Sequence, residues 1–155
     1  MSASHFRELE VWQLAMDLAQ AVYRTCAQFP REERYGLAAQ LQRAAVSIPS
    51  NLAEGNARGS TRDYARFVSM ARGSCAELQT QLLLAERLEL GVGPDLAATL
   101  TLCERVSQML ARLQQSLQRR IESGSRVPGP VSQKRPRTTD HAPSFRPQNH
   151  PADRR

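Results

Sequence analysis

Arginines and other polar side chains recur at helical spacing between Arg43 and Glu77, and this stretch holds most of the residues that are suited to ligand binding. Side chains three or four positions apart lie on the same face of a helix. The stretch therefore carries one polar stripe on its first half and another on its second half. The first stripe comprises Arg43, Ser47, Asn51, Glu54 and Arg58, and the second comprises Arg62, Arg66, Gly73 and Glu77.

The arginines are the first candidates for binding. Arg58, Arg62 and Arg66 fall within nine residues, and Asp63 is the only acidic residue among them. Cations at a helix N-terminus oppose the helix dipole, which favours a role other than stability, and guanidinium groups pair well with phosphate. Aromatic residues for base stacking are scarce, so base-specific readout is not expected. We predict nucleic-acid contact through Arg43, Arg58, Arg62, Arg66 and Arg72; the alternative is a solvated charged face.

The remaining polar residues of the stripes allow two interpretations. Ser47, Asn51, Glu54 and Glu77 would form a structural polar network if they lie between helices, because buried polar groups need partners and the stretch supplies both charges. In that network Arg43 or Arg66 would pair with a glutamate. The alternative is a surface that faces a binding partner. We predict the network.

The residue types that catalysis or metal binding needs are missing from the helical region. The histidines, His5, His141 and His150, all lie outside it. Di-iron sites in helix bundles need Glu-x-x-His pairs, and Glu54 with Glu77 alone would be a weak ligand set. No Ser, Cys or Thr has a nearby His, and no Gly-rich loop precedes a helix. We therefore expect no enzyme, no metal ion and no cofactor.

Apolar residues at spacings of three and four predict four helices, over about 7–28, 31–58, 60–90 and 94–122. The connections between them are short, which favours an all-α, antiparallel up-down-up-down four-helix bundle. The first helix carries two adjacent apolar stripes. One bundle core needs fewer apolar positions, so we expect this helix also to contribute to self-association.

Local signals give the details of the second and third helices. Pro49 lies inside the second helix and predicts a kink that frees the carbonyl of Ala45, with Ser47 or Ser50 as its new partner. Ser60 is the predicted N-cap of the third helix. Gly91 is its predicted C-terminal stop.

The composition changes near Ser123. Residues 1–122 hold fourteen Arg against thirteen Asp or Glu, whereas residues 123–155 hold six Arg and one Lys against two Asp. Six of the nine prolines lie in this second part, which has few aliphatic residues. We therefore expect a bundle domain at 7–122 and a disordered, Pro/Arg-rich tail at 123–155. The basic run Lys134–Arg137 is either an RNA-binding arm or a solvated extension.

The cysteines and the N-terminus indicate the compartment. Cys26, Cys75 and Cys103 are odd in number, widely spaced and placed on apolar helical faces, which favours buried, reduced thiols over a zinc site. The start of the chain has no apolar region typical of a secretion signal. No apolar run approaches the ~20 residues of a membrane span. We expect a cytoplasmic protein that does not contact membranes.

Several motifs, in their order and spacing, resemble the 23S rRNA intervening sequence protein family. They are ELEVWQLA, YGLAAQ, QLQRAAVSIPSNLAEG and ARGSCAEL, and the resemblance runs from about His5 to Arg120 without the tail. It implies an antiparallel four-helix bundle that assembles into a homopentamer with a basic surface. In the related accessory variability proteins of diversity-generating retroelements, the pentamer engages a reverse transcriptase and nucleic acid.

Together these features predict a non-enzymatic, self-associating binding module that contacts RNA or other nucleic acid through an arginine-rich surface. The alternative is a protein-interaction scaffold, or an accessory subunit for a partner enzyme such as a reverse transcriptase.

Overall fold

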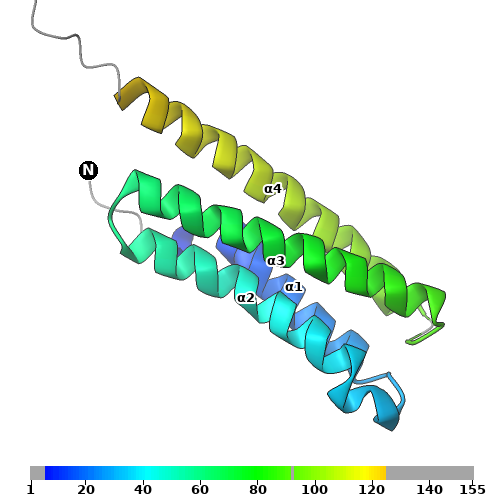
Figure 1. Cartoon of the computed structure of the whole chain (residues 1–155). Helices are drawn as coiled ribbons and strands as arrows, with labels where there is room; N and C mark the ends of the chain where they lie inside the picture. Colours follow the sequence, from blue (N-terminus) through cyan, green and yellow to red (C-terminus); the bar gives the residue numbers. More distant parts are fainter. Residues whose placement is uncertain (1–5, 92, 125–155) are drawn as a thin grey trace, which may run out of the picture.

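The computed structural model describes residues 6–91 and 93–124, and all regular structure in these residues is helical. Each long helix packs against its neighbours in sequence, and the first also packs against the last (Figure 1). The predicted all-α, up-down-up-down bundle is confirmed. The helices are α1 (Glu10–Cys26), α2 (Leu37–Ala57), α3 (Thr61–Arg87) and α4 (Pro94–Gly124), with short 3-10 turns η1 (Phe6–Glu8) and η2 (Arg31–Tyr35).

The predicted tail lies almost entirely outside the described residues. Ser123 and Gly124, which we assigned to the tail, instead complete α4. The prediction of disorder from residue 125 onwards stays a prediction.

The core consists of one apolar face from each helix. Leu18, Ile48, Leu78 and Leu110 come from α1 to α4 in turn, and none of them is exposed to solvent. Burying a side chain of this size stabilises the folded state by roughly 1.5–3 kcal/mol. Ile48, Leu78 and Leu110 lie in the core as the apolar spacing of their helices predicted. On α1 the prediction is partly wrong, because the stripe that holds Leu18 is buried while Met16 and Tyr23, on the neighbouring stripe, are exposed.

The first two long helices begin later than predicted. Residues 31–35 form η2 rather than the first turns of α2, and α2 begins at Leu37 after Gly36. The carboxylate of Glu33 accepts a hydrogen bond from the Leu37 N–H at 3.1 Å, which satisfies one free donor at this helix start. Similarly, η1 replaces the start of α1, which begins at Glu10.

Pro49 does not interrupt α2, which continues to Ala57. Our prediction that Ser47 or Ser50 would bond to the Ala45 carbonyl is wrong. The Ser50 hydroxyl donates to the Val46 carbonyl at 2.8 Å, because that acceptor lies one turn before it.

Small residues let α2 and α3 approach closely near the turn that joins them. A Cβ atom added to Gly55 would lie 2.5 Å from the Cβ atom of Phe67 and 3.0 Å from Cδ2 of Tyr64. Carbon atoms do not approach to 2.5 Å without a bond between them. Glycine at position 55 is therefore a requirement of this helix pair.

Both ends of α3 have defined caps. The Ser60 hydroxyl accepts a hydrogen bond from the Asp63 N–H at 3.3 Å, so the predicted N-cap is confirmed. At the other end, the N–H groups of Glu89 and Leu90 donate to the carbonyls of Glu86 and Ala85, at 3.1 and 2.9 Å. This is a Schellman motif, in which Glu89 holds a positive φ of 56°. The helix thus ends before Gly91, which also has a positive φ, of 67°.

A buried pair of hydroxyl groups joins α1 to α4. The oxygens of Thr25 and Thr99 lie 3.0 Å apart, and Thr99 also donates to the Asp95 carbonyl at 2.8 Å. Thr25 therefore donates to Thr99, and both buried hydroxyls have partners.

No helix among the described residues has both the length and the apolar content that crossing a bilayer requires.

Candidate nucleic-acid interface

The arginines that the sequence singled out do not all have the same surroundings. Arg58, just after α2, forms an ion pair with Glu54, and its guanidinium carbon lies 5.5 Å from the centre of the Phe67 ring. The hydrogen bond to Glu54 also raises the pKa of Arg58. This side chain already has an anionic and an aromatic partner, so it is the least available of the predicted set.

Three arginines on α3 are available to a ligand. Arg62, Arg66 and Arg72 are exposed, and none of them forms an ion pair within residues 6–91 and 93–124. They lie within eleven residues of one helix, which is about 15 Å along its axis. Asp63 is exposed beside them, and in the described part of the chain its carboxylate pairs with no arginine. The first turns of α3 thus carry two arginines, Arg62 and Arg66, beside one exposed carboxylate, Asp63.

Arg43 does not join this group. It is exposed on the first half of α2, fifteen residues before Arg58. Fifteen helical residues span about 22 Å, so Arg43 lies well away from the turn between α2 and α3. The structure therefore places Arg62 and Arg66 on one face of α3, with Arg72 on the same helix but about 120° around its axis from Arg66, and it leaves Arg43 apart.

The predicted polar network forms with a partly different membership. The Asn51 amide donates to the Ser47 hydroxyl at 3.0 Å and to the Ser47 carbonyl at 2.8 Å. The Ser47 hydroxyl lies 2.9 Å from the hydroxyl of Ser74, which donates to the Met70 carbonyl at 3.3 Å. This chain of hydrogen bonds crosses from α2 to α3. Sequence reasoning missed Ser74, whose only signal was its small size.

The two glutamates lie outside this network. Glu54 pairs with Arg58, and Glu77 accepts a hydrogen bond from Gln81 at 3.0 Å on the exposed face of α3. The predicted pairing of a glutamate with Arg43 or Arg66 does not occur among the described residues. Each glutamate instead uses a partner four positions along its own chain, a spacing that brings helical side chains together.

The three cysteines are buried, free thiols, in agreement with the sequence. The Cys75 and Cys103 sulfur atoms lie 3.8 Å apart between α3 and α4, and this pairing was not predicted. The hydrogen bond with Cys75 and burial raise the pKa of Cys103. Burial also raises the pKa of Cys26 to about 11. Cys26 and Cys103 therefore stay protonated and act as small apolar side chains. The same hydrogen bond lowers the pKa of its partner, Cys75.

The described residues contain no group of three or more His, Cys, Asp or Glu side chains that are placed to hold a metal ion.

Comparison of the sequence with known protein families gives a match. The family model for the 23S rRNA-intervening sequence protein matches residues 7–112, about two thirds of the chain. The chain belongs to this family. No curated protein matches the chain.

The match to the 23S rRNA-intervening sequence protein family includes α1, α2, α3 and most of α4. It therefore includes every arginine predicted as a binding residue, and the Ser47–Asn51–Ser74 network. It ends at Arg112, so the last turns of α4 and the basic tail lie beyond it. The family name refers to 23S rRNA, which is consistent with a role related to nucleic acid.

Proposed function

We propose that this protein is a non-enzymatic binding module that contacts RNA or other nucleic acid through Arg62, Arg66 and Arg72. The supporting observation is that these three exposed guanidinium groups share one helix and have no carboxylate partner in the described part of the chain. Arginines that serve only solubility on a helix are commonly paired with glutamates at i±4. Cations without such partners favour binding to phosphates.

Replacing all three arginines with glutamine is expected to weaken binding of a structured RNA by about tenfold or more near 0.1 M salt. Each lost phosphate contact lowers the salt dependence, so the slope of log K against log[salt] should flatten by about 0.9 per contact. Fluorescence anisotropy at several salt concentrations measures both quantities.

A triple variant of Arg24, Arg31 and Arg87 is the matched control. These residues are also exposed and lie at the other end of the bundle, so the variant loses equal charge elsewhere (Figure 1). It should bind nearly as well as the unmodified protein. Absence of RNA binding by the unmodified chain would contradict the proposal. Salt-insensitive binding to a protein would favour the accessory-subunit alternative, for which the retroelement relatives suggest a reverse transcriptase.

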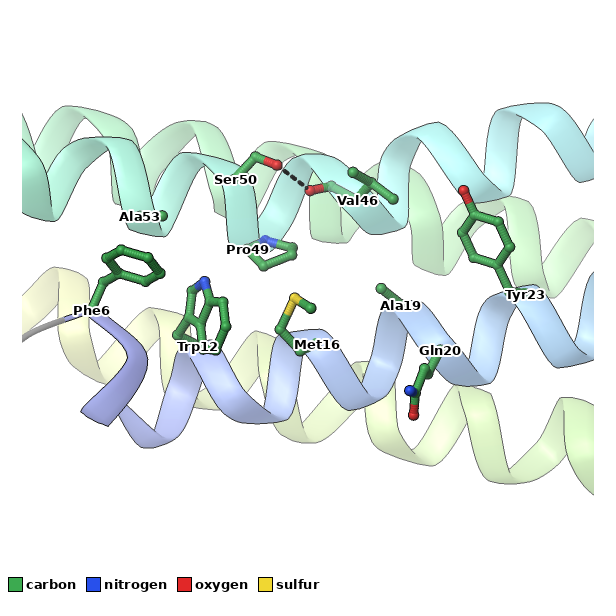
Figure 2. Close-up of a pocket in the computed structure, with 10 residues that line it drawn as sticks. All are labelled: Phe6, Trp12, Met16, Ala19, Gln20, Tyr23, Val46, Pro49, Ser50 and Ala53. Carbon is green, nitrogen blue, oxygen red and sulfur yellow. Dashed lines mark hydrogen bonds between the residues drawn. The ribbon is translucent and has the colours of Figure 1, made fainter.

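We also propose that the protein self-associates, as a homopentamer if the resemblance extends to assembly. An apolar groove of about 410 Å³ lies between α1 and α2. Figure 2 shows Trp12 and Met16 of α1 facing Pro49 of α2 across it. The rims of the groove are exposed: the relative solvent exposures of Met16, Tyr23 and Val46 are 44, 50 and 43%. The groove is lined by one of the two apolar stripes of the first helix, which includes Trp12, Met16 and Tyr23, while the other stripe is buried in the core.

A second copy of the chain offers a matching surface. Leu84, in the last turn of α3, and Leu88, the residue directly after this helix, have relative exposures of 45 and 55% and lie four positions apart, on one face. A contact between this leucine ridge and the groove of another subunit would be heterologous, and such contacts generate closed rings when the rotation permits.

Changing Leu84 and Leu88 to glutamate should therefore convert the assembly into a 17.3 kDa monomer, as measured by light scattering. Leu83→Glu is the control, because Leu83 is equally exposed at 44% but points about 100° away around the helix. A monomeric unmodified protein at micromolar concentration would contradict self-association. Dissociation by Leu83→Glu alone would assign the contact to a different face.

A further inference from the structure

The exposed face of α4 carries a row of arginines that the sequence analysis did not single out. Arg105, Arg112 and Arg119 recur at intervals of seven residues, and all three are exposed. They lie on the side of α4 opposite the core, since the buried positions of this helix include Cys103, Val106 and Leu110. We call these three residues the α4 row.

The α4 row is straight and regularly spaced. Seven residues advance about 10.5 Å along a helix and change direction by only about 20°, so three arginines span about 21 Å on one side. The positions between them on this side are uncharged and include the exposed Gln108 and Gln115, with the half-buried Met109 as the apolar exception. Amide side chains donate hydrogen bonds to phosphate and sugar oxygens.

The α4 row has no carboxylate at the spacing that usually pairs an arginine on a solvated helical face, although the exposed Glu104 directly precedes Arg105. Glutamate four positions from an arginine is the common pattern for such a face. Here every position four residues before or after the three arginines is uncharged, and none of the arginines forms an ion pair within the described ranges. Glu122, three positions after Arg119, accepts a hydrogen bond from Gln118 instead. The positions concerned are Thr101, Gln108, Met109, Gln115, Ser116 and Ser123.

We propose that the α4 row binds the phosphate backbone of double-stranded nucleic acid. A duplex presents about one phosphate charge per 1.7 Å of its axis, so a row of about 21 Å passes roughly a dozen phosphates. Single-stranded ligands are typically held by aromatic side chains, and α4 contains none. Spaced cations and neutral amides without aromatic residues fit a backbone whose bases stay stacked.

The position of the α4 row connects it to the proposed interface on α3. The C-terminal end of α4 and the turn between α2 and α3 lie at the same end of the bundle (Figure 1). Arg119 therefore lies towards the end that also carries Arg62 and Arg66. The row extends the nucleic-acid contact proposed above along a second helix, and it rests on that proposed function.

The test compares triple variants of the full chain on a blunt 24-base-pair RNA duplex, the matching DNA duplex and one RNA strand alone. Changing Arg105, Arg112 and Arg119 to glutamine should weaken duplex binding at least tenfold near 0.1 M salt. It should also flatten the slope of log K against log[salt] by up to about 2.7 per engaged subunit. The corresponding lysine triple keeps the charge and should retain most of the slope. Circular dichroism checks that each variant keeps its helix content.

Three outcomes are distinguishable. If the Arg62, Arg66 and Arg72 variant loses binding and the α4 variant does not, the proposed function stands and the α4 row is excluded from it. If the unmodified protein binds no nucleic acid, both proposals fall. If the α4 variant weakens binding of the single strand as much as that of the duplexes, or no more than the Arg24, Arg31 and Arg87 control does, the assignment to a duplex backbone is wrong.

Discussion

Gly55→Ala is expected to destabilise the protein by about 2–4 kcal/mol, a large fraction of the 5–15 kcal/mol that typically separates folded from unfolded domains. The added Cβ atom would lie 2.5 Å from Cβ of Phe67. That atom is bonded directly to the α3 backbone, so no rotation of the Phe67 side chain can move it away. Relief requires α2 and α3 to separate, which would loosen the core contacts that they share.

Gly73→Ala is the matched control for this prediction. Gly73 also lies inside a helix, and a Cβ atom there would have no neighbour within 4 Å. Alanine should therefore stabilise the protein by about 0.5–1 kcal/mol, because it reduces the backbone freedom of the unfolded chain. Urea unfolding midpoints of the two variants should move in opposite directions. A neutral Gly55→Ala variant would contradict the close approach of α2 and α3.

Gly91→Ala, in the connection between α3 and α4, is expected to lower the free energy of unfolding by about 2 kcal/mol. Gly91 has a φ of 67°, and a side chain in this left-handed region costs roughly 1–2 kcal/mol. The new Cβ atom would also lie 2.8 Å from Cε1 of Phe29, although that ring atom can shift. The backbone contribution therefore dominates, and thermal unfolding should show a lower melting temperature.

Glu89→Gly should have the opposite effect in the same connection. Glu89 occupies the left-handed position of the Schellman motif, with a φ of 56°, which glycine adopts without a steric penalty. The free energy of unfolding should increase by about 1 kcal/mol, which raises the melting temperature by a few degrees. If both variants were destabilised, the left-handed conformation at position 89 would be in doubt.

The periodic and capping signals of the sequence predicted most of this fold. Apolar spacing placed Ile48, Leu78 and Leu110 in the core, because a surface helix must bury one continuous stripe. The first helix has two apolar stripes, and spacing alone did not tell which of them is buried. Ser60 was recognisable as a cap since its hydroxyl precedes a helical pattern. The late start of α2 was not predicted, although Gly36 was a readable signal for a break.

Contacts between helices were harder to predict than the helices themselves. The Ser47–Ser74 and Cys75–Cys103 pairs depend on the register between neighbouring helices, which a one-dimensional pattern does not contain. The sequence also did not predict which arginines are free to bind a ligand. Arg58 pairs with Glu54 and lies over the Phe67 ring, whereas Arg62 has no ion-pair partner among the described residues. The heptad spacing of the α4 row, in contrast, is visible in the sequence alone.

The capped start of α3 affects the entropy of any association at this surface. Because Ser60 fixes the first turn, the backbone that carries Arg62 and Arg66 is ordered before a ligand arrives. Association would then immobilise side chains alone, at roughly 0.5–1.5 kcal/mol each, without the larger cost of folding a segment on contact. A surface prepared in this way adapts little to its ligand, and it favours ligands whose own shape is already rigid.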